Sequence, residues 1–350
     1  MSNILSLTPD ELREIMNQID EPGYRSKQIF TQLHKGIELR EMTNVGNKTK
    51  EKLLSLMDCA FPGIKKKLVS QIDGTVKYLF ELSDKNCIES VVMKYEHGYT
   101  ICVSSQVGCR MGCRFCASTL MGRVRNLEAG EILGQIIAAE KDLNIRISNV
   151  VMMGIGEPLD NFENVVKFLR LVNEPDGLNI GYRHISLSSC GIVDKIYELS
   201  KLNLPITLSI SLHAADDSTR CEIMPINNKW NIESLMEACR SYYEVTGRRI
   251  SFEYTLIAGK NDTAGDARRL GELLNRRLRG GKGHMPIHVN LIPVNEVKET
   301  SFKSSGAKAV REFVNELEKL GIRATVRRRL GADINASCGQ LRRADAESIP

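Results

Sequence analysis

The sequence predicts an α/β protein built on a partial (β/α)6 barrel, with a small helical domain before it and a short β-hairpin extension between the two. Two observations predict this. The hydrophobic period changes after residue 62 from that of helices to strict alternation. Six strands, each followed by a helix, then follow over residues 99–319. This series is two units short of a full eight-unit barrel, and a doubly wound open sheet is the alternative.

The first helix is expected to begin after Thr8, because Thr8 can cap it, Pro9 suits the first helical position and Glu11 completes a capping box. Two further helical stretches follow, near 24–35 and 47–58. Pro62 then breaks the chain. Residues 1–62 are therefore predicted to form a helical domain.

Asp73 and Gly74 form a hairpin signal between two apolar runs, and residues 87–94 have the character of a strand. Residues 63–94 are thus expected to form the extension, and residues 95–350 the barrel. The strands of the barrel are expected at 99–105, 148–153, 183–188, 205–212, 250–257 and 286–292, and its helices at 128–142, 161–173, 191–201, 231–246, 263–278 and 305–319, with a last strand at 322–326. Ligands belong at the carboxyl ends of such strands.

Composition narrows the class of protein. The 350 residues are 42% hydrophobic and 26% charged, as in soluble globular proteins, and no apolar run is long enough to span a membrane. The N-terminus lacks the pattern of a secretory signal, so we expect a cytoplasmic protein whose ten cysteines stay reduced. The net charge of +5 permits a polyanionic partner without requiring one.

Cys109, Cys113 and Cys116 have the spacing CxxxCxxC on a loop after the first barrel strand, where Gly108 and Gly112 let the backbone curve tightly. Three thiolates can converge on one soft metal centre. No fourth ligand lies at zinc-finger distance, and three ligands suit a [4Fe–4S] cluster with one iron left open. The alternative is a zinc site completed from elsewhere, or reactive cysteines without metal.

Several motifs together resemble one family. CxxxCxxC after the first strand of a β/α series is similar to the radical S-adenosylmethionine superfamily. The segments CVSSQVGCRMGCRFCAST, GIGEPLDN, SLHA, MPIN and GADINASCGQL resemble the RlmN/Cfr family of RNA adenine methyltransferases. The resemblance covers about residues 85–345. It implies a radical-SAM barrel, one [4Fe–4S] cluster per subunit on the three cysteines, and two molecules of S-adenosylmethionine per turnover.

The resemblance also implies the residues that contact S-adenosylmethionine. They lie at the ends of strands and are Gly156, Glu157, Ser188, Ser211, Leu212, His213 and Asn295. Their hydroxyl, imidazole, amide and carboxylate groups suit a ribose, an adenine edge and an ammonium group. Ser189 remains an alternative to Ser188, and Asn290 to Asn295. Without the resemblance, the glycines would indicate an ordinary turn and the histidine a structural role.

Three more residues gain roles only from the resemblance. Cys338 matches the cysteine that is methylated first, Cys102 the one that resolves the product, and Glu89 the general base. The implied reaction converts methyl-Cys338 to a carbon radical that adds to adenine C2, and a transient disulfide between Cys102 and Cys338 then frees the product. The remaining cysteines are expected to be small buried hydrophobes, namely Cys59, Cys87, Cys190, Cys221 and Cys239.

The implied substrates are 23S rRNA, at adenine 2503, and tRNA, at adenine 37. Basic residues that could meet phosphates cluster at 65–67, 276–279, 323 with 327–329, and 342–343. We expect the run 327–329 to be the best placed, because it leads to Cys338, and the helical domain to grip RNA away from the reacting base. We also expect that the protein takes electrons from a donor such as flavodoxin or ferredoxin, that it is a monomer and that it does not contact a membrane.

Two other functions stay open. A Cfr-like enzyme would methylate adenine C8 of 23S rRNA and confer antibiotic resistance, but Pro158 favours the C2 enzymes, because the resistance enzymes carry Ala there. A non-enzymatic iron–sulfur or zinc protein that binds RNA belongs to a different class. Such a protein would have no need of Cys102 and Cys338.

Overall fold

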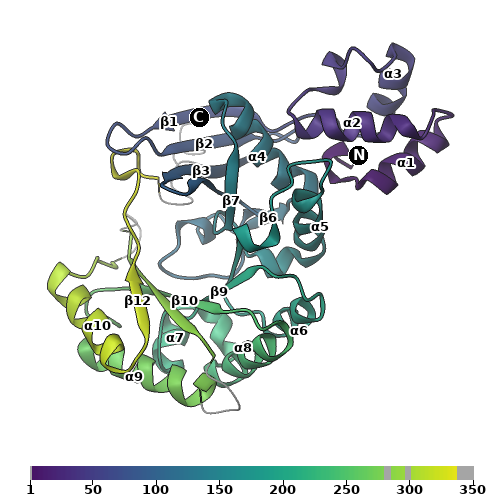
Figure 1. Ribbon diagram of the computed structural model, residues 1–350. Coiled ribbons are helices and arrows are strands. Elements are labelled where there is room, and N and C mark those ends of the chain that lie inside the picture. The colour runs from purple at the N-terminus through teal and green to yellow at the C-terminus, as the bar shows by residue number, and fades with distance from the viewer. Residues whose placement is uncertain (1, 280–284, 296–300, 337–350) are drawn as a thin grey trace.

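The computed structural model describes residues 2–279, 285–295 and 301–336, and its centre is one sheet of ten strands (Figure 1). The strands lie side by side in chain order, from β1 to β4 and then from β7 to β12. Their bounds are β1 Gly63–Val69, β2 Val76–Glu81, β3 Cys87–Tyr95, β4 Gly98–Cys102, β7 Ile147–Met152, β8 Ile185–Ser189, β9 Thr207–Ser211, β10 Ile250–Leu256, β11 Ile287–Pro293 and β12 Arg323–Val326.

The strands from β4 to β12 pair in parallel, and a helical crossover separates each from the next. A doubly wound sheet would reverse its strand order at a switch point, and this order never reverses. The predicted partial barrel is therefore confirmed. Its helices are α4 Ala129–Leu143, α5 Phe162–Asn173, α6 Val193–Lys201, α8 Ile232–Thr246, α9 Ala264–Leu274 and α10 Ala307–Lys319.

The extension belongs to the same sheet as the barrel. Strands β1, β2 and β3 pair antiparallel, and β3 pairs antiparallel with β4, the first strand of the barrel. In Figure 1 this part of the sheet lies above the barrel helices, and the chain after β12 runs up to the turn between β1 and β2. One sheet thus connects residues near 70 with residues near the C-terminus.

Some predicted elements differ in length or were not predicted. The first barrel strand ends at Cys102, three residues earlier than expected, and the chain then forms β5 (Gln106–Gly108). That strand pairs with β6 (Arg123–Asn126) in a separate two-stranded sheet. The crossover between β9 and β10 has an additional short helix, α7 (Asp217–Ile223), and α9 continues as a turn of π-helix over Asn275–Arg279. These segments are too short to produce a clear period.

The N-terminal helices are α1 (Pro9–Gln18), α2 (Tyr24–His34) and α3 (Asn47–Leu56). The predicted capping box is present, since the Thr8 side chain accepts from the Glu11 amide and the Glu11 carboxylate accepts from the Thr8 amide. Figure 1 shows these helices at one end of the molecule, beside α4 and α5. The domain divisions at residues 62 and 94 stay predictions.

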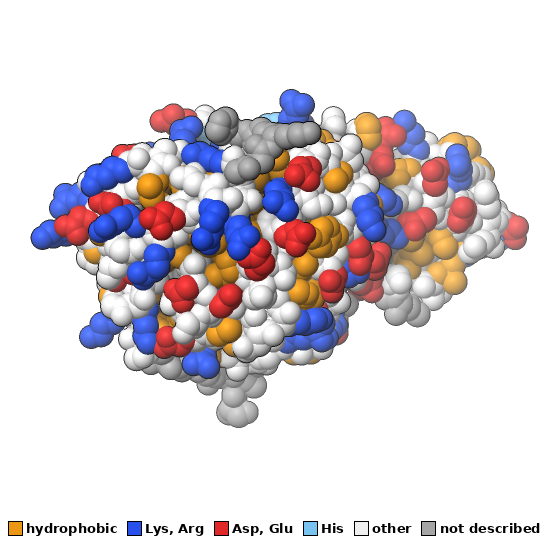
Figure 2. Space-filling model, turned by 90° about the horizontal axis from the view of Figure 1, so that it is seen from below, with side chains coloured by type: hydrophobic (Ala, Val, Ile, Leu, Met, Phe, Trp, Pro, Cys, Tyr) orange, Lys and Arg blue, Asp and Glu red, His pale blue; other side chains and the backbone are white. Residues whose placement is uncertain are grey.

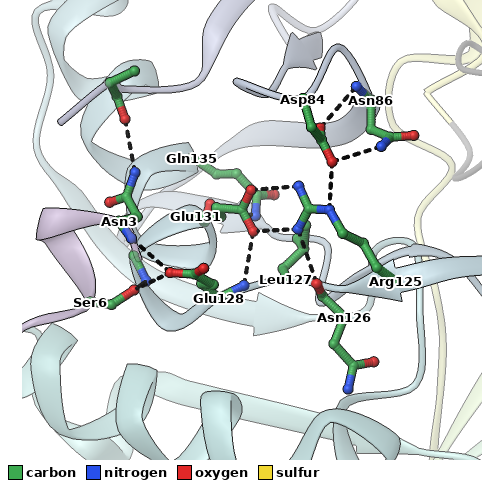
Figure 3. Close-up of polar contacts among 12 residues, drawn as sticks. Asn3, Ser6, Asp84, Asn86, Arg125, Asn126, Leu127, Glu128, Glu131 and Gln135 are labelled. Atoms are coloured by element: carbon green, nitrogen blue, oxygen red, sulfur yellow. Dashed lines mark hydrogen bonds and ion pairs between the residues drawn. The ribbon is translucent and has the colours of Figure 1, made fainter. Parts of the chain in front are cut away.

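A polar junction joins the N-terminal segment to the barrel (Figure 3). The Glu128 carboxylate, at the start of α4, accepts hydrogen bonds from the Asn3 amide at 2.8 Å and the Ser6 hydroxyl at 3.4 Å. Beside it, the Arg125 guanidinium forms a bidentate ion pair with Glu131 and reaches Asp84 in the turn between β2 and β3. These contacts tie residues 3–6 and the turn between β2 and β3, both distant in sequence, to the N-terminus of α4.

Among the helices of the described residues, none is long and apolar enough to cross a membrane.

We expect Glu128→Ala to lower the free energy of unfolding by about 1–3 kcal/mol, because two hydrogen bonds and a helix-start carboxylate are lost together. Urea denaturation measures this. The control is Glu163→Ala, an exposed residue in the first turn of α5, which should change the value by less than about 0.5 kcal/mol. Equal effects of the two changes would show that the junction contributes nothing.

Candidate active site

Small polar side chains line the inner face of the parallel sheet. Residues paired across parallel strands point to the same side, and Ser188 on β8 pairs with Ser209 on β9. Ser211 pairs with Glu253 on β10, which pairs with Asn290 on β11. Closed barrels usually fill this space with branched apolar side chains. The serines here leave room at the carboxyl ends of the strands.

The sequence left Ser189 open as an alternative to Ser188, and Asn290 as an alternative to Asn295. The register and the hydrogen bonds of the strands bear on both. Ser188 faces the interior, whereas the hydroxyl of Ser189 accepts a hydrogen bond from the Gly191 amide at 3.0 Å within the following turn. The Asn290 amide donates to Glu253 at 2.6 Å, while Asn295 lines a cavity described below. The geometry favours Ser188 and Asn295 as contacts for a ligand.

Glu253 was not predicted from the sequence. It is 4% exposed, and burial raises the pKa of its carboxyl group despite the hydrogen bond from Asn290. The signal that could have found it is a single acidic residue in ISFEYTL, a strand buried throughout its length.

The three cysteines of the CxxxCxxC motif lie on a loop closed at its base by β5 and β6. The Cys109 amide donates to the Gly122 carbonyl at 3.1 Å. At Gly108, with φ +78°, a Cβ would lie only 1.8 Å from that carbonyl oxygen, so the close approach requires glycine. The loop is therefore shaped before any ligand binds.

Asp160 fastens this loop to the next strand end. Its carboxylate, 6% exposed, accepts from Gln106 at 2.9 Å and from Arg110 and Arg123 at 3.0 Å each. Burial alone would raise the pKa of Asp160, but the hydrogen bonds from Arg110 and Gln106 lower it. Arg110 directly follows Cys109, so the ion pair holds the cysteine loop in place.

The thiols of the loop lie near one another in poorly solvated surroundings. Burial raises the pKa of Cys109 to about 12 and that of Cys113 well above its usual value, and the charges of the neighbouring cysteines act in the same direction. Such thiols lose their protons only when a cation stabilises the thiolates. Within the described ranges, no three His, Cys, Asp or Glu side chains are close enough to ligate a single metal ion. In a four-iron cluster each thiolate binds a different iron, so the donor set fits a cluster.

The motif GIGEP follows β7 and packs closely on the chain after β4. Gly156 has φ +111°, and a Cβ there would lie 2.7 Å from the Gln106 side chain. The next residue, Glu157, is 4% exposed, and its carboxylate accepts from the Leu159 amide at 3.0 Å and the Cys190 amide at 2.8 Å. Burial nevertheless raises the pKa of Glu157. Glu157 thus ties the end of β7 to the end of β8.

His213 follows β9 and lies against the cysteine loop. Its ring meets Phe115, between Cys113 and Cys116, edge-on at a centroid distance of 4.9 Å. Nδ1 accepts from the Thr255 amide at 2.9 Å, and burial lowers the pKa of the imidazole to about 3. The ring is therefore neutral and carries its proton on Nε2. Leu212, just before it, is fully buried.

Arg220, on α7, was also missed by the sequence analysis. It is 0% exposed, and its guanidinium donates to the carbonyls of Cys190 (2.8 Å), Ser211 (3.2 Å) and Leu212 (3.1 Å) and to the Asn227 side chain (2.8 Å). One side chain therefore holds the ends of β8 and β9 at a fixed spacing. The signal in the sequence that could have indicated Arg220 is the motif MPIN, because its Asn227 is one of the partners of Arg220.

A cavity of about 250 Å³ lies over the carboxyl ends of the strands. The cavity is lined by predicted site residues from the first part of the barrel sequence and from its last part: Cys102, Cys116, Asn295, Arg327, Arg328 and Arg329. Leu330 and Ala336 pack against Cys102 and the apolar residues beside it. Cys338 lies outside the described residues, but Ala336, two positions before it, borders the cavity.

Glu89 lies on β3 and is not among the residues that line the cavity. The Glu89 side chain is 1% exposed and forms an ion pair of 3.0 Å with Lys77 on β2. Val91, two residues on along the same face of β3, borders the cavity.

The other basic runs are mostly engaged within the protein. Arg277 pairs with Glu233, Arg279 donates to the Gly321 carbonyl at 3.0 Å, and Lys67 pairs with Asp142 at 2.5 Å. Figure 2 shows Lys and Arg side chains interspersed with Asp and Glu over the face that it presents. The run 327–329 differs because it faces the cavity. Positions 342–343 lie outside the described residues.

The cysteines expected to be buried divide into two groups. Cys87, Cys190 and Cys239 are buried, whereas Cys59 and Cys221 are only partly so.

Comparison with known proteins gives consistent matches. Residues 103–270 match the radical SAM superfamily, and residues 2–58 match the ribosomal RNA large subunit methyltransferase N-terminal domain. A probable dual-specificity RNA methyltransferase RlmN from Clostridium novyi is 53% identical over 98% of both chains. A protein of the same description from Clostridium acetobutylicum is 51% identical over 98% of this chain and 97% of its own. The crystal structure of a radical SAM methyltransferase from Sphaerobacter thermophilus superposes with a TM-score of 0.91, at 36% identity over 97% of this chain and 99% of that one.

We expect Arg220→Lys to lower the free energy of unfolding by about 2–4 kcal/mol, because an ammonium cannot reach all four acceptors and leaves buried carbonyls without donors. Thermal or urea denaturation measures the loss. Arg240→Lys, an exposed position on α8, is the matched control and should be close to neutral. A neutral Arg220→Lys would contradict the role of Arg220 in joining the strand ends.

Proposed function

Because the chain belongs to the RlmN/Cfr family of radical S-adenosylmethionine RNA methyltransferases, we propose that it methylates C2 of adenine in RNA, at position 2503 of 23S rRNA and position 37 of tRNA. The observation that carries this proposal is the single cavity that brings together Cys102, Cys116 of the CxxxCxxC loop and the segment leading to Cys338. A binding protein without chemistry gives no reason for Cys102 and Cys116 to line one cavity with this segment.

Cys109, Cys113 and Cys116 would hold a [4Fe–4S] cluster, which supplies the one-electron cleavage of S-adenosylmethionine when both are bound. The residues proposed to contact S-adenosylmethionine are those predicted from the sequence: Gly156, Glu157, Ser188, Ser211, Leu212, His213 and Asn295. Their support is position, since all lie at the carboxyl ends of barrel strands or directly after them. The neutral His213 would donate from Nε2, and Glu157 retains acceptor capacity beside its two backbone donors.

Three side chains would carry the methyl transfer. Cys338 accepts the methyl group on sulfur from one S-adenosylmethionine. A hydrogen atom of that methyl group would pass to the radical fragment of a second S-adenosylmethionine, and the carbon radical that remains would bond to adenine C2 and join protein and RNA covalently. One electron would then leave the adduct for a one-electron acceptor such as the oxidised form of the electron donor. Glu89 takes up the C2 proton. The Cys102 thiolate attacks the sulfur of Cys338, so that a disulfide forms and the sulfur–carbon bond breaks, leaving its electron pair on a carbon that takes a proton. The position of Cys102 on the cavity wall, where it is 3% exposed, supports this role.

The guanidinium groups of 327–329 would receive RNA phosphates at the mouth of the cavity. The helical N-terminal region would contact RNA further from the reacting base. We also propose a cytoplasmic monomer that takes electrons from a flavodoxin- or ferredoxin-type donor.

The test of the reaction is product analysis. Anaerobically reconstituted protein is incubated with S-adenosylmethionine, reductant and unmodified 23S rRNA, and the nucleosides are identified by mass and chromatography. We expect 2-methyladenosine, and none from Cys116→Ala, which lacks one cluster ligand. 8-Methyladenosine would instead identify the Cfr-like alternative, and unmodified adenosine would contradict both.

Replacing Cys102 tests the assignment of roles. Cys102→Ala should still bond to RNA through Cys338 but should not release it, because no thiolate is in reach. Cys338→Ala should never bond. A denaturing gel of each protein purified from cells, with and without ribonuclease, detects the adduct. The control, Cys239→Ala, changes a buried cysteine on α8 and should form no lasting adduct. A folded Cys102→Ala protein with an intact cluster and no ribonuclease-sensitive adduct would exclude the resolving role.

A further inference from the structure

A lysine and a glutamate are buried together under the loop that leads to Cys338. The side chain of Lys77 on β2 is 0% exposed and that of Glu89 on β3 is 1% exposed, and their charged atoms lie 3.0 Å apart. They sit on the face of the sheet that bears Leu79, Val91 and Met93, since residues two apart along a strand share a face. Two charges are therefore buried side by side next to apolar side chains of this face.

Stability does not explain the pair. Removing two charges from water costs free energy that their attraction roughly repays, so two apolar side chains of similar volume would stabilise the sheet as well or better. A buried lysine whose ammonium touches a proposed catalytic carboxylate is instead typical of a functional site. A second acceptor of Lys77 among the described residues shows which function.

That acceptor is the backbone of the segment before Cys338. Lys77 Nζ donates to the Asn335 carbonyl at 3.0 Å, across 258 positions of sequence. The turn between β1 and β2 holds the same segment: the Gly331 amide donates to Asp73 at 2.8 Å, and Asp333 accepts from the Ser70 hydroxyl at 2.7 Å. We call residues 331–336 the catalytic strap. Figure 1 shows the chain after β12 reaching this turn.

We propose that Lys77 is a positioning residue of the methyl transfer: its ammonium holds the Glu89 carboxylate and the catalytic strap together, and so sets the place of the base relative to the cysteine that carries the methyl group. This inference rests on the proposed function and adds Lys77, and the extension that bears it, to the machinery of the reaction.

The physical argument has two parts. Without the ammonium, the Glu89 carboxylate loses a partner that lies 3.0 Å away and fixes its place, so the proposed base is no longer held where it takes up the C2 proton. Without the donor to Asn335, the catalytic strap loses a hydrogen bond that lies three positions before Cys338. Methylation of Cys338 precedes proton removal, so the later steps should suffer and the first should not.

The experiment compares Lys77→Met with Ile88→Ala. Ile88 neighbours Glu89 but lies on the opposite face of β3, is 0% exposed and belongs to the main core, so its truncation destabilises the same strand without touching the pair. Lys77→Met should methylate Cys338 to the same extent as Ile88→Ala, measured by mass of the purified protein. It should release RNA from the adduct at least about tenfold more slowly, as expected when general-base catalysis is impaired.

A second measurement does not depend on the reaction. Amide hydrogen exchange in 331–336 should be about fivefold faster in Lys77→Met than in Ile88→Ala, the ratio expected when the net contribution of one hydrogen bond is lost. The double variant Lys77→Met with Glu89→Gln should regain the unfolding temperature lost in Lys77→Met, because both members of the buried pair are then neutral, but it should not regain RNA release.

The outcomes separate the two proposals. Release at the rate of Ile88→Ala, or unchanged exchange in the catalytic strap, would overturn the role of Lys77. Equal loss of Cys338 methylation and of release would indicate a structural role only, which also overturns it. If the product analysis finds only unmodified adenosine, the proposed function fails, and the exchange measurement still decides whether Lys77 holds the catalytic strap.

Discussion

The register of the parallel strands is the constraint on which the site depends. Neighbouring parallel strands place paired residues on the same side, so Ser188, Ser211 and Glu253 can face one interior only while β8, β9 and β10 keep their alignment. A shift of one residue in any strand would turn its polar side chains into the helical layer. The contacts beyond the strand ends preserve this alignment, because they fix where each strand stops relative to its neighbour.

Those contacts are made by charged side chains. Glu157 accepts from two backbone amides and Arg220 donates to three backbone carbonyls, whereas Asp160 binds the side chains of Gln106, Arg110 and Arg123 at the base of the cysteine loop. A buried charge is costly unless its hydrogen-bonding capacity is used, and here it is used on turns that have no regular structure of their own. These side chains therefore fix the path of the loops that follow the strands.

Much of the architecture could be predicted from the sequence, because hydrophobic period and capping residues act over short distances. The start of α1 at Thr8 and the unbroken β/α series are examples. The pair β5–β6 could not be predicted, since strands of three and four residues have no measurable period. In the site, the cysteine spacing was visible locally. The partners of Lys77, and the Cys190 partner of Arg220, come from other segments of the sequence, so no spacing indicates them.

The contacts that hold residues 331–336 also bear on how the molecule assembles. They join positions separated by 258 to 263 residues, the longest sequence separations among the hydrogen bonds described. During synthesis the strands from β1 to β11 leave the ribosome before these residues do, and pairings of such separation form late in folding. Most of the sheet can therefore be in place before residues 331–336 reach the turn between β1 and β2. Docking of this segment would then be among the last events by which the newborn chain acquires its structure.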